Sequence, residues 1–324
     1  MEKFLSCDWG TSSFRLRIVE VPGLLVVAEQ KSDQGITNSF ELWKQSKKSE
    51  DDRLIFYLDI IGHHIKILEE KSGTSLNELP LVISGMASST IGMINLPYKE
   101  LPFSMDGSDL DVKMIEAGDS FSHRTIIVSG AKSIDDMMRG EETQLVGCFY
   151  KKPFDKKDQI FIFPGTHSKH IIVENGKAVA VKTYMTGEFF KLLSKKSILS
   201  HSVDEGTGLL HPENIRQFEK GVGDSAESNL LHSCFRVRTN HLFGKFTRQE
   251  NYYYLSGLLI GTEMKELTGG YVNVSLVSNK ILGPYYEKAF NFLNKKNSIL
   301  EIHNADEAIV HGQFKIYKKI SEKE

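Results

Sequence analysis

Two stretches half a chain apart decide the fold: residues 3–20 read KFLSCDWGTSSFRLRIVE, and residues 160–173 read IFIFPGTHSKHIIV. A shift of 155 residues aligns three pairs, namely Gly10 with Gly165, Thr11 with Thr166, and Ser13 with Ser168. In both copies an apolar strand precedes a Gly-Thr-x-Ser turn, and a strand rich in β-branched residues follows it. A second turn, at Pro22-Gly23 or at Asn175-Gly176, then leads into a third strand. The repetition predicts a duplicated strand–turn–strand unit, with two unrelated hairpins as the alternative.

The repeated turn has the chemistry of an anion site. A Gly-Thr/Ser hairpin tip presents backbone N–H groups and hydroxyls in a small concavity, and glycine lets the backbone approach a ligand closely. Two such tips facing each other across a cleft can hold the β- and γ-phosphates of a nucleotide. The duplication resembles the actin-like ATPase and sugar-kinase fold. It predicts an α/β protein with two similar actin/hexokinase-like (ribonuclease H-like) domains around a central nucleotide cleft.

Other phosphate motifs are missing from the chain. It contains neither a GxxxxGK[ST] P-loop nor a GxGxxG stretch that opens a helix. The formal net charge is −2, from 40 basic and 42 acidic residues, whereas a broad nucleic-acid footprint needs a basic excess. We therefore expect no nucleic-acid partner.

The location is expected to be cytoplasmic. Cys7, Cys148 and Cys234 are far apart and have no metal-ligand spacing, which is typical of buried thiols in a reducing compartment. The N-terminus shows no signal-peptide pattern. No apolar run approaches the ~20 residues that a membrane span needs.

The length of 324 residues suits two domains, expected at 1–150 and 151–324, with a boundary near Lys151–Asp158. Apolar periodicity predicts helices at Phe40–Lys71, Glu141–Tyr150, Gly187–Leu193, Gln249–Leu267, Leu282–Leu293 and Asp306–Lys319. Short apolar runs predict strands at Leu81–Ser84, Thr125–Ser129 and Val272–Val277. Alternation of strands and helices indicates α/β layers.

Several stretches resemble the 2-dehydro-3-deoxygalactonokinase family, and they are spread over most of the chain. They are Asp8–Arg17 (DWGTSSFRLR), Asp136–Gln144 (DMMRGEETQ), Pro164–Lys169 (PGTHSK), Met185–Glu188 (MTGE) and Ser256–Gly261 (SGLLIG). The first and third are similar to the family's two phosphate loops, and the second to its most distinctive stretch. The resemblance implies an ATP- and Mg²⁺-dependent kinase that phosphorylates the 6-hydroxyl of a 2-keto-3-deoxy sugar acid, 2-dehydro-3-deoxy-D-galactonate, in galactonate catabolism.

The chain departs from the family pattern in two places. Thr90 and Met93 stand where the family usually has an arginine and a tryptophan, which leaves the sugar acid open. Ser278-Asn279 stands where the family's adenosine turn usually bears glycine. Asparagine tolerates a left-handed turn, so this departure is compatible with a turn at that place.

The expected nucleotide site combines the two loops. Asp8, at the end of the first strand, is the candidate for holding Mg²⁺ through water, although such an aspartate can also cap its own turn. His167 suits packing within its loop better than catalysis, because its reference pKa near ~6.5 does not suit a permanent phosphate clamp. The candidate nucleotide-binding residues are Asp8, Gly10, Thr11, Ser12, Gly165, Thr166, His167, Ser168, Lys169 and Ser278.

Phosphoryl transfer to a hydroxyl needs a general base and an anchor for the substrate carboxylate. Asp136 is our candidate base among the acids of its stretch, with Glu141 a second catalytic candidate; one of Glu141 and Glu142 can instead simply start a helix. Arg139 and Arg15 can pair bidentately with a carboxylate, or can serve in structural ion pairs. The remaining substrate candidates are Ser88, Ser89, Glu142 and Glu188.

Two other functions remain open at this stage. One is a phosphohydrolase on the same fold with water as the nucleophile, and the other is a nucleotide- or sugar-binding regulator without turnover. Sugar-stimulated release of ADP distinguishes a kinase from a hydrolase. The expected partners are a small-molecule sugar acid and ATP, without a membrane, and a homodimer is compatible with the sequence.

Overall fold

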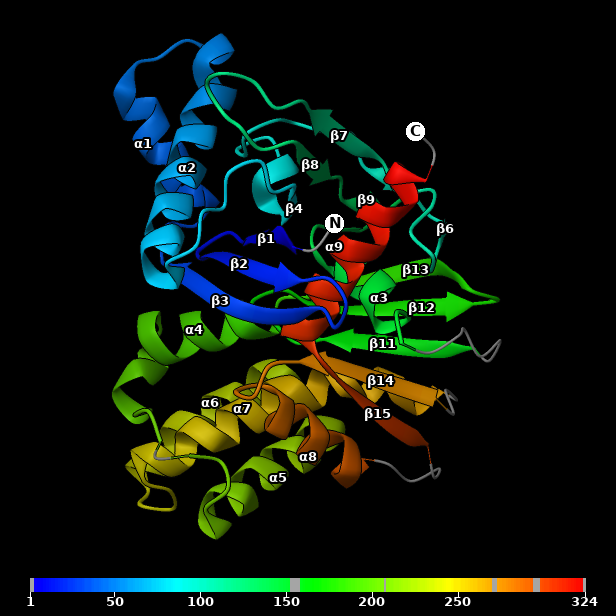
Figure 1. The fold of residues 1–324 in the computed structure, drawn as a ribbon. Helices are drawn as coiled ribbons and strands as arrows, with labels where there is room; N and C mark the ends of the chain where they lie inside the picture. Colours follow the sequence, from blue (N-terminus) through cyan, green and yellow to red (C-terminus); the bar gives the residue numbers. More distant parts are fainter. Residues whose placement is uncertain (1–2, 152–157, 207, 270–272, 294–297, 323–324) are drawn as a thin grey trace. The chain divides into compact units, whose positions relative to one another are not determined.

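The structure is a computed structural model that describes residues 3–151, 158–206, 208–269, 273–293 and 298–322 (Figure 1). The chain divides into two compact units that are interleaved along the sequence. Unit 1 comprises Met1–Lys156, Gly176–Val181 and Ala305–Glu324, and unit 2 comprises Lys157–Asn175 and Lys182–Asn304. The expected domains 1–150 and 151–324 stay a prediction, and most of the expected boundary lies outside the described residues.

Unit 1 is built on a six-stranded sheet with the order β3-β2-β1-β4-β8-β7. Its strands are β1 (Lys3–Trp9), β2 (Phe14–Glu20), β3 (Leu25–Ser32), β4 (Leu81–Gly85), β7 (Val112–Ile115) and β8 (Thr125–Val128). The first three form an antiparallel meander, and β4 and β8 continue the sheet parallel to β1. A small sheet has the order β10-β9-β5, with β5 at Lys99–Glu100, β9 at Ala131–Lys132 and β10 at Met137–Met138.

Unit 2 repeats this topology. Its strands are β11 (Gln159–Phe163), β12 (Ser168–Glu174), β14 (Asn273–Ser278) and β15 (Ile299–Asn304), and β12 leads into β13 (Lys177–Tyr184). β11 and β12 are antiparallel, whereas β14 and β15 run parallel to β11. The meander followed by two parallel strands is the arrangement of β1 to β4 and β8, so the duplication expected from the sequence is confirmed. The start of β13 belongs to unit 1, where it pairs with β6 (Phe103–Ser104).

Helices cover both faces of the unit 1 sheet. They are α1 (Ile36–Ser46), α2 (Arg53–Ser72), α3 (Glu141–Cys148) and α9 (Ala305–Ser321). In β1, alternation sends Leu5, Cys7 and Trp9 into a core shared with α2, so Asp8 lies on the opposite face. On that opposite face α9 contacts β1 and β4 and crosses α3 closely. Glycine makes this crossing possible, because a Cβ atom on Gly312 would lie 1.8 Å from the carbonyl oxygen of Thr143.

The helices of unit 2 form two layers (Figure 1). They are α4 (Thr186–Lys196), α5 (Pro212–Glu227), α6 (Leu230–Leu242), α7 (Arg248–Met264) and α8 (Gly283–Leu293). One core joins β11 and β14 to α5, α7 and α8. A second core joins the other side of α7 to α4 and α6. Helix α7 is therefore central, and nearly all its residues from Tyr253 to Met264 are buried.

Most predicted elements are present, with three differences. The single helix expected at Phe40–Lys71 is two helices, because Lys47 turns left-handed with φ 54° and a capping box of Ser49 and Asp52 restarts the chain in a 3₁₀ turn. Helices α5 and α6 were not predicted, although Pro212 and Asn229 are favourable start residues. Strands β5, β6, β7, β9, β10 and β15 were also not predicted, and Val272 of the expected strand lies outside the described residues.

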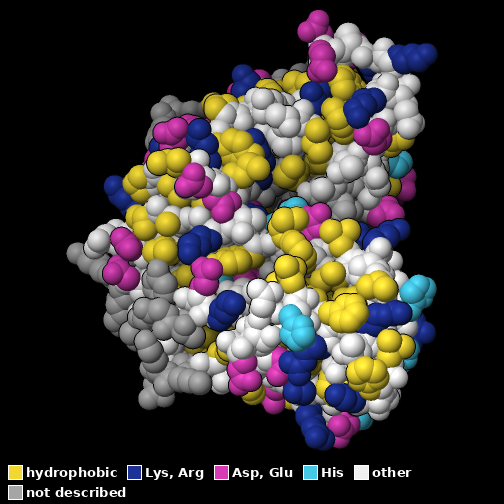
Figure 2. All heavy atoms as spheres, turned by 180° about the vertical axis from the view of Figure 1, so that it is seen from behind, with side chains coloured by type: hydrophobic (Ala, Val, Ile, Leu, Met, Phe, Trp, Pro, Cys, Tyr) yellow, Lys and Arg dark blue, Asp and Glu magenta, His cyan; other side chains and the backbone are white. Residues whose placement is uncertain are grey.

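Charge on the surface is mixed. On the face drawn in Figure 2, Lys and Arg side chains alternate with Asp and Glu side chains, and neither sign covers it. Within the described residues, no helix is both long and apolar enough to cross a membrane. Cys7, Cys148 and Cys234, which all lie in this described part, form no disulfide.

Candidate active site

The loop between β1 and β2 carries the first Gly-Thr-x-Ser sequence, and its tip is exposed. Gly10 closes the hairpin by donating its N–H to the carbonyl oxygen of Ser13 at 2.9 Å. The start of α1 fixes the loop from behind: the N–H groups of Ile36 and Thr37 donate to the carbonyl oxygens of Gly10 and Thr11 at 3.0 and 3.1 Å. The side chains of residues 11–13 therefore project into solvent from a fixed backbone.

The loop between β11 and β12 is held in the same way. The N–H of Glu188, in the first turn of α4, donates to the carbonyl oxygen of Thr166 at 3.0 Å. Glycine is required beside it, because a Cβ atom on Gly187 would lie 2.5 Å from the carbonyl oxygen of Gly165. Gly35 has this role in unit 1, where its Cβ atom would lie 2.4 Å from the carbonyl oxygen of Thr11. The repeat thus extends to the helix that follows the meander, which the sequence alignment did not reveal.

The polar side chains of the second loop point in different directions. Thr166 and His167 are exposed, and the His167 imidazole contacts the carboxylate of Glu188. Lys169 is buried, and its ammonium donates to the carbonyl oxygen of His167 at 3.0 Å, directly at the loop. Ser168 is fully buried, and its hydroxyl donates to the Glu263 carboxylate at 2.7 Å. In this structure the Ser168 hydroxyl therefore belongs to an internal network rather than to the exposed tip.

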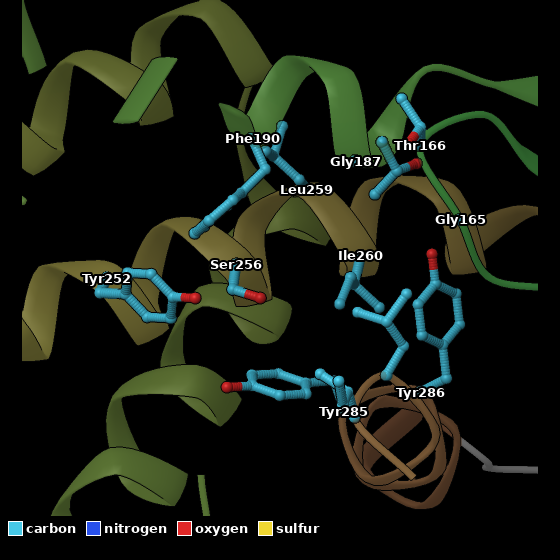
Figure 3. Close-up of a pocket in the computed structure, with 13 residues that line it drawn as sticks. Gly165, Thr166, Gly187, Phe190, Tyr252, Ser256, Leu259, Ile260, Tyr285 and Tyr286 are labelled. Atoms are coloured by element: carbon cyan, nitrogen blue, oxygen red, sulfur yellow. The ribbon is translucent and has the colours of Figure 1, made fainter. Parts of the chain in front are cut away.

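A cavity of about 280 Å³ adjoins this loop within unit 2 (Figure 3). Gly165 and Thr166 lie at one end of it and Tyr252 at the other, while Tyr285 and Tyr286 of α8 form a wall. Its lining is apolar and aromatic with a few hydroxyl groups. Such a cavity next to an anion-binding loop suits a ligand with a flat ring and a phosphate tail. The lining residues are Gly165, Thr166, Thr186, Gly187, Phe190, Tyr252, Ser256, Leu259, Ile260, Ile281, Leu282, Tyr285 and Tyr286.

Ser278 and Asn279 connect β14 to the start of α8 near this cavity. Ser278 is buried, and a Cβ atom on Gly283 would lie 2.7 Å from its hydroxyl oxygen. The Asn279 carboxamide accepts from the N–H groups of Ile281 and Leu282 at 2.9 and 3.0 Å. Asn279 is not among the described non-glycine residues with positive φ, so the tolerance of asparagine for a left-handed turn is not used here. Asparagine serves here as a cap for α8.

In unit 1, the Asp8 carboxylate lies beside Gly85, which in turn lies beside Gly140. A Cβ atom on Gly85 would lie 3.6 Å from the Asp8 carboxylate, and one on Gly140 would lie 3.5 Å from the Cα of Gly85. Both glycines have positive φ, 91° and 105°, which disfavours any side chain there. Partial burial raises the pKa of Asp8 above its ordinary 3.8, and the guanidinium groups of Arg17 and Arg15 oppose the rise. Glycine at position 85 also allows close packing of β4 on β1, because its Cβ atom would lie 2.7 Å from the carbonyl oxygen of Trp9.

Glu142 lies in the first turn of α3. Its buried carboxylate accepts from the Gly140 N–H at 2.7 Å and from the Thr143 hydroxyl at 2.9 Å. Burial, and secondarily the charge of Glu141, raises the pKa of Glu142 from 4.5 to about 8. Glu141 is half-buried, and its carboxylate accepts from the backbone N–H of Arg139 at 3.1 Å. Both acids thus bond to backbone N–H groups at the helix start, and the raised pKa of Glu142 favours its protonated form.

Arg139 braces the loop that carries the predicted serines. Its guanidinium donates to the carbonyl oxygen and hydroxyl of Ser88 at 2.5 and 2.7 Å and to the carbonyl oxygen of Leu96 at 3.3 Å. It also stacks 4.0 Å from the centroid of the Tyr98 ring. Ser88 and Ser89 are both buried. The guanidinium expected to bind a substrate carboxylate is thus already engaged by backbone oxygens of residues 88–96.

The other predicted residues of unit 1 are also engaged. Asp136 lies in the hairpin between β9 and β10, and its carboxylate accepts from the N–H of Met137 at 2.8 Å. Arg15 forms an ion pair with Asp306 of α9, which the buried Arg17 shares at 2.9 Å. At the departures from the family pattern, Met93 is buried in the unit 1 core.

Three features escaped the sequence interpretation. The aromatic residues Tyr252, Tyr285 and Tyr286 line the cavity, but their spacing alone resembles that of any buried helix. Glu263 receives hydrogen bonds from several elements; a carboxylate inside the apolar run of α7 was the available signal, because fully buried glutamate is rare unless paired. Gly35 carries no signal beyond being a glycine after a strand.

Residues 8–316 match the family model described as 2-keto-3-deoxy-galactonokinase. The chain belongs to this family. The family match spans both loops, the Glu142 region and the cavity, so it includes every site residue named above. The matched range also contains the stretch SGLLIG at 256–261. Glycines in this stretch let α7 approach α5, because a Cβ atom on Gly257 would lie 2.1 Å from the carbonyl oxygen of Phe218.

Relatives within the family are similar over nearly their whole length. A protein of Rhizobium meliloti (strain 1021) named "Probable 2-dehydro-3-deoxygalactonokinase" is 28% identical over 95% of this chain and 94% of its own. The 2-dehydro-3-deoxygalactonokinase of Escherichia coli (strain K12) is 27% identical, with 89% of each chain covered. A crystal structure from Sinorhizobium meliloti that carries the same enzyme name superposes with a TM-score of 0.78 at 26% identity, over 98% of this chain and 99% of that one.

A more distant structure shows the fold alone. The activator of 2-hydroxyisocaproyl-CoA dehydratase from Clostridium difficile has a TM-score of 0.50 at 11% identity, over 99% of this chain and 97% of that one. The expected α/β fold of the actin-like class is confirmed.

Proposed function

We propose that this protein is a sugar-acid kinase that transfers the γ-phosphate of ATP to the 6-hydroxyl of 2-dehydro-3-deoxy-D-galactonate in galactonate catabolism. The observation that carries the proposal is the match of residues 8–316 to one kinase family, including both phosphate-type loops. Relatives that share more than a quarter of its residues over most of their length bear the name of this enzyme. No feature of the described residues favours the hydrolase or the regulator over the kinase.

We assign the nucleotide to the following residues. The exposed backbone and hydroxyls of the loop at Thr166 would bind phosphate oxygens, with the Lys169 ammonium behind them. The adjoining cavity would hold adenosine, with its ring against Tyr252 and Tyr285. In unit 1, Gly10, Thr11 and Ser12 would bind phosphate oxygens through the same kind of loop. Phosphate binding of this kind requires fixed N–H groups, and both loops are fixed by the helix that follows them.

Asp8 fits a magnesium ion. Magnesium is usually held by one or two carboxylates together with waters and substrate phosphates. Among the described residues, no group of three or more His, Cys, Asp or Glu side chains could form a complete protein cage. Asp8 instead offers one partly exposed carboxylate near the end of β1, next to the exposed Gly-Thr loop. When bound, magnesium supplies positive charge for the phosphate oxygens.

The chain's own residues would direct the transfer. We assign Asp136 as the base that takes the proton of the 6-hydroxyl. The hydroxyl oxygen bonds to the γ-phosphorus while the bond between this phosphorus and ADP breaks. Arg139 would act by fixing residues 88–96, whose serines we assign to the sugar acid, together with Glu141, Glu142 and Glu188. Arg15 would act through Asp306 rather than by direct contact. Exclusion of water from the reacting phosphate would favour the sugar over hydrolysis.

The proposal extends to the setting of the enzyme. Three cysteines that form no disulfide fit the reducing cytoplasm. ATP and a sugar acid would be its small-molecule substrates, without nucleic acid, and light scattering after size-exclusion chromatography would decide whether it forms a homodimer.

Release of ADP from Mg-ATP, measured with and without a series of 2-keto-3-deoxy sugar acids, tests the proposal. We expect ADP to form only with a sugar acid present, and fastest with the galacto isomer. Equal ADP release without any sugar acid would contradict it and favour the hydrolase.

A further inference from the structure

Glu263 is a buried carboxylate at the C-terminal end of α7, and it receives four hydrogen bonds from three other elements. Its Oε1 accepts from the Ser168 hydroxyl at 2.7 Å and from the His170 imidazole at 2.9 Å, both on β12. Its Oε2 accepts from the Tyr286 hydroxyl of α8 at 2.7 Å and from the Thr186 hydroxyl of α4. A carboxylate has about four acceptor positions, so this one is fully used.

Three of the four donors, Ser168, Thr186 and Tyr286, belong to the two parts of the proposed nucleotide site. Ser168 ends the loop that carries Thr166, and Thr186 begins the helix that fixes this loop. Tyr286 and Thr186 also line the cavity. In Figure 3 the Tyr286 hydroxyl points toward the chain segment that bears Gly165. One carboxylate therefore connects the loop, the helix start and the cavity wall.

Glu263 itself is held rigidly. A Cβ atom on Gly261 would lie 2.9 Å from the Cα of Val222 in α5, and one on Gly257 would lie 2.1 Å from the carbonyl oxygen of Phe218. This close packing of α7 on α5 leaves little freedom at the end of α7. Glu263 is 2% exposed, so its partners are not replaced by water. A buried carboxylate that cannot move fixes the positions of its hydrogen-bond donors relative to one another.

We propose that Glu263 is a positioning residue that sets the loop at Thr166 and the cavity wall at Tyr286 in a single geometry for the nucleotide. This inference rests on the proposed function. The inference goes beyond that function because it makes nucleotide affinity depend on a residue that does not line the cavity. The expected signature is a change in nucleotide affinity without a matching change for the sugar acid.

The first test compares Glu263→Gln with Glu266→Gln by calorimetric titration with Mg-ADP. Loss of charged hydrogen bonds should raise the Kd of the Glu263→Gln protein about 10- to 100-fold. The control changes the same group near the same helix end, where Glu266 is half-exposed and bonds to Lys182 at the surface. We expect its Kd to stay within about twofold of the unchanged protein.

Steady-state kinetics separate positioning from folding. Glu263→Gln should raise the KM for ATP and leave the KM for the sugar acid unchanged, whereas a loss of folded enzyme lowers kcat and moves neither KM. Unchanged ADP affinity in a folded Glu263→Gln protein would overturn the inference. Absence of ADP binding in the unchanged protein would instead overturn the proposed function, so the two failures are distinguishable.

A double-mutant cycle tests the connection even if Glu263→Gln does not fold. Thr186→Val keeps a branched side chain at the cavity and removes one donor to Glu263, and Ser168→Ala removes one donor from the loop. Tyr286 is not used in the cycle, because its hydroxyl also donates directly to the Ser168 hydroxyl at 3.4 Å. If Glu263 links them, the combined loss of ADP affinity should be clearly smaller than the product of the two single losses. Losses that multiply fully would show two independent bonds and would overturn the inference.

Discussion

The backbone N–H of Glu188 donates a 3.0 Å hydrogen bond to the carbonyl oxygen of Thr166. The corresponding bond in unit 1 joins Thr37 to Thr11 at 3.1 Å. In each unit, then, the helix after the three-stranded meander fixes the exposed Gly-Thr turn. Because both turns are fixed in this way, their N–H groups and hydroxyls are ready to receive an anion without a cost for ordering the loop.

Replacement of Gly187 should displace the second loop. In Gly187→Ala the new Cβ atom would lie 2.5 Å from the Gly165 carbonyl oxygen and 2.8 Å from the Thr166 Cα, so the backbone must shift. Overpacking of this kind should raise the KM for ATP about 10-fold or more. The measurement is the KM for ATP at saturating sugar acid.

Gly223→Ala is the matched control. It lies within α5, where its Cβ atom would make an ordinary 3.5 Å contact with the Phe292 ring. Alanine should stabilise this helix by about 1 kcal/mol and leave the KM for ATP unchanged. If Gly187→Ala also leaves that KM unchanged, the loop does not bind the nucleotide.

Asp136→Asn separates a catalytic carboxylate from a turn residue. The asparagine side-chain oxygen can still accept from the Met137 N–H, so the hairpin should persist. Loss of a general base should lower kcat by about 10²- to 10⁴-fold while ADP affinity stays normal. Asp135→Asn, at the exposed neighbouring position, is the control. Normal turnover of Asp136→Asn would assign this carboxylate to the turn alone.

Arg139→Lys keeps the charge but removes the planar fork that reaches Ser88 and Leu96. Because the buried serine segment loses its donors, kcat/KM for the sugar acid should fall about 10- to 100-fold, with little change in the KM for ATP. Arg216→Lys, on the exposed side of α5, should change neither value. If only the KM for ATP rises, Arg139 supports the nucleotide site and not the sugar-acid site.

The raised pKa of Glu142 predicts a dependence of stability on pH. Its pKa rises from 4.5 to about 8 on folding, so the folded state holds the proton more tightly than the unfolded chain. The stabilising contribution of this proton is complete below pH 4.5 and is lost as the pH rises through about 8. Glu142→Gln should therefore become more stable relative to the unchanged protein by up to about 1.4 kcal/mol per pH unit over this range.

Urea unfolding between pH 5 and 9 measures this difference. Glu116→Gln, at a side chain 72% exposed, should give a difference that does not depend on pH. A constant difference for Glu142→Gln as well would mean that the carboxylate is ionised in the folded protein.

Repetition made much of the fold predictable. Apolar alternation and turn chemistry were sufficient to predict the two Gly-Thr-x-Ser hairpins. The Asn175-Gly176 turn has the positive φ angles that this residue pair favours. The long helix at Phe40–Lys71 was wrong because periodicity continues on both sides of Lys47, and the break depends on a single left-handed residue. Helix α5 was not predicted because its polar face and two glycines weaken the apolar pattern.

The candidate site was predictable as a set of residues and less so as a set of contacts. Sequence places Arg139 and Glu142 in one stretch, but cannot tell that the guanidinium bonds to carbonyl oxygens 43 to 51 residues away. Such partners come from tertiary packing. Likewise, nothing local distinguishes the Thr166 hydroxyl, which is exposed, from that of Ser168, which is turned inward to Glu263.

Incubation of the protein with Mg-ATP and 2-dehydro-3-deoxy-D-galactonate, followed by measurement of ADP and sugar phosphate in the same samples, tests the proposed transfer most directly. We expect equal amounts of the two products, with the phosphorus coupled to the C6 hydrogens in the NMR spectrum. Inorganic phosphate appearing at the same rate with or without the sugar acid, or no ADP at all, would contradict the assignment.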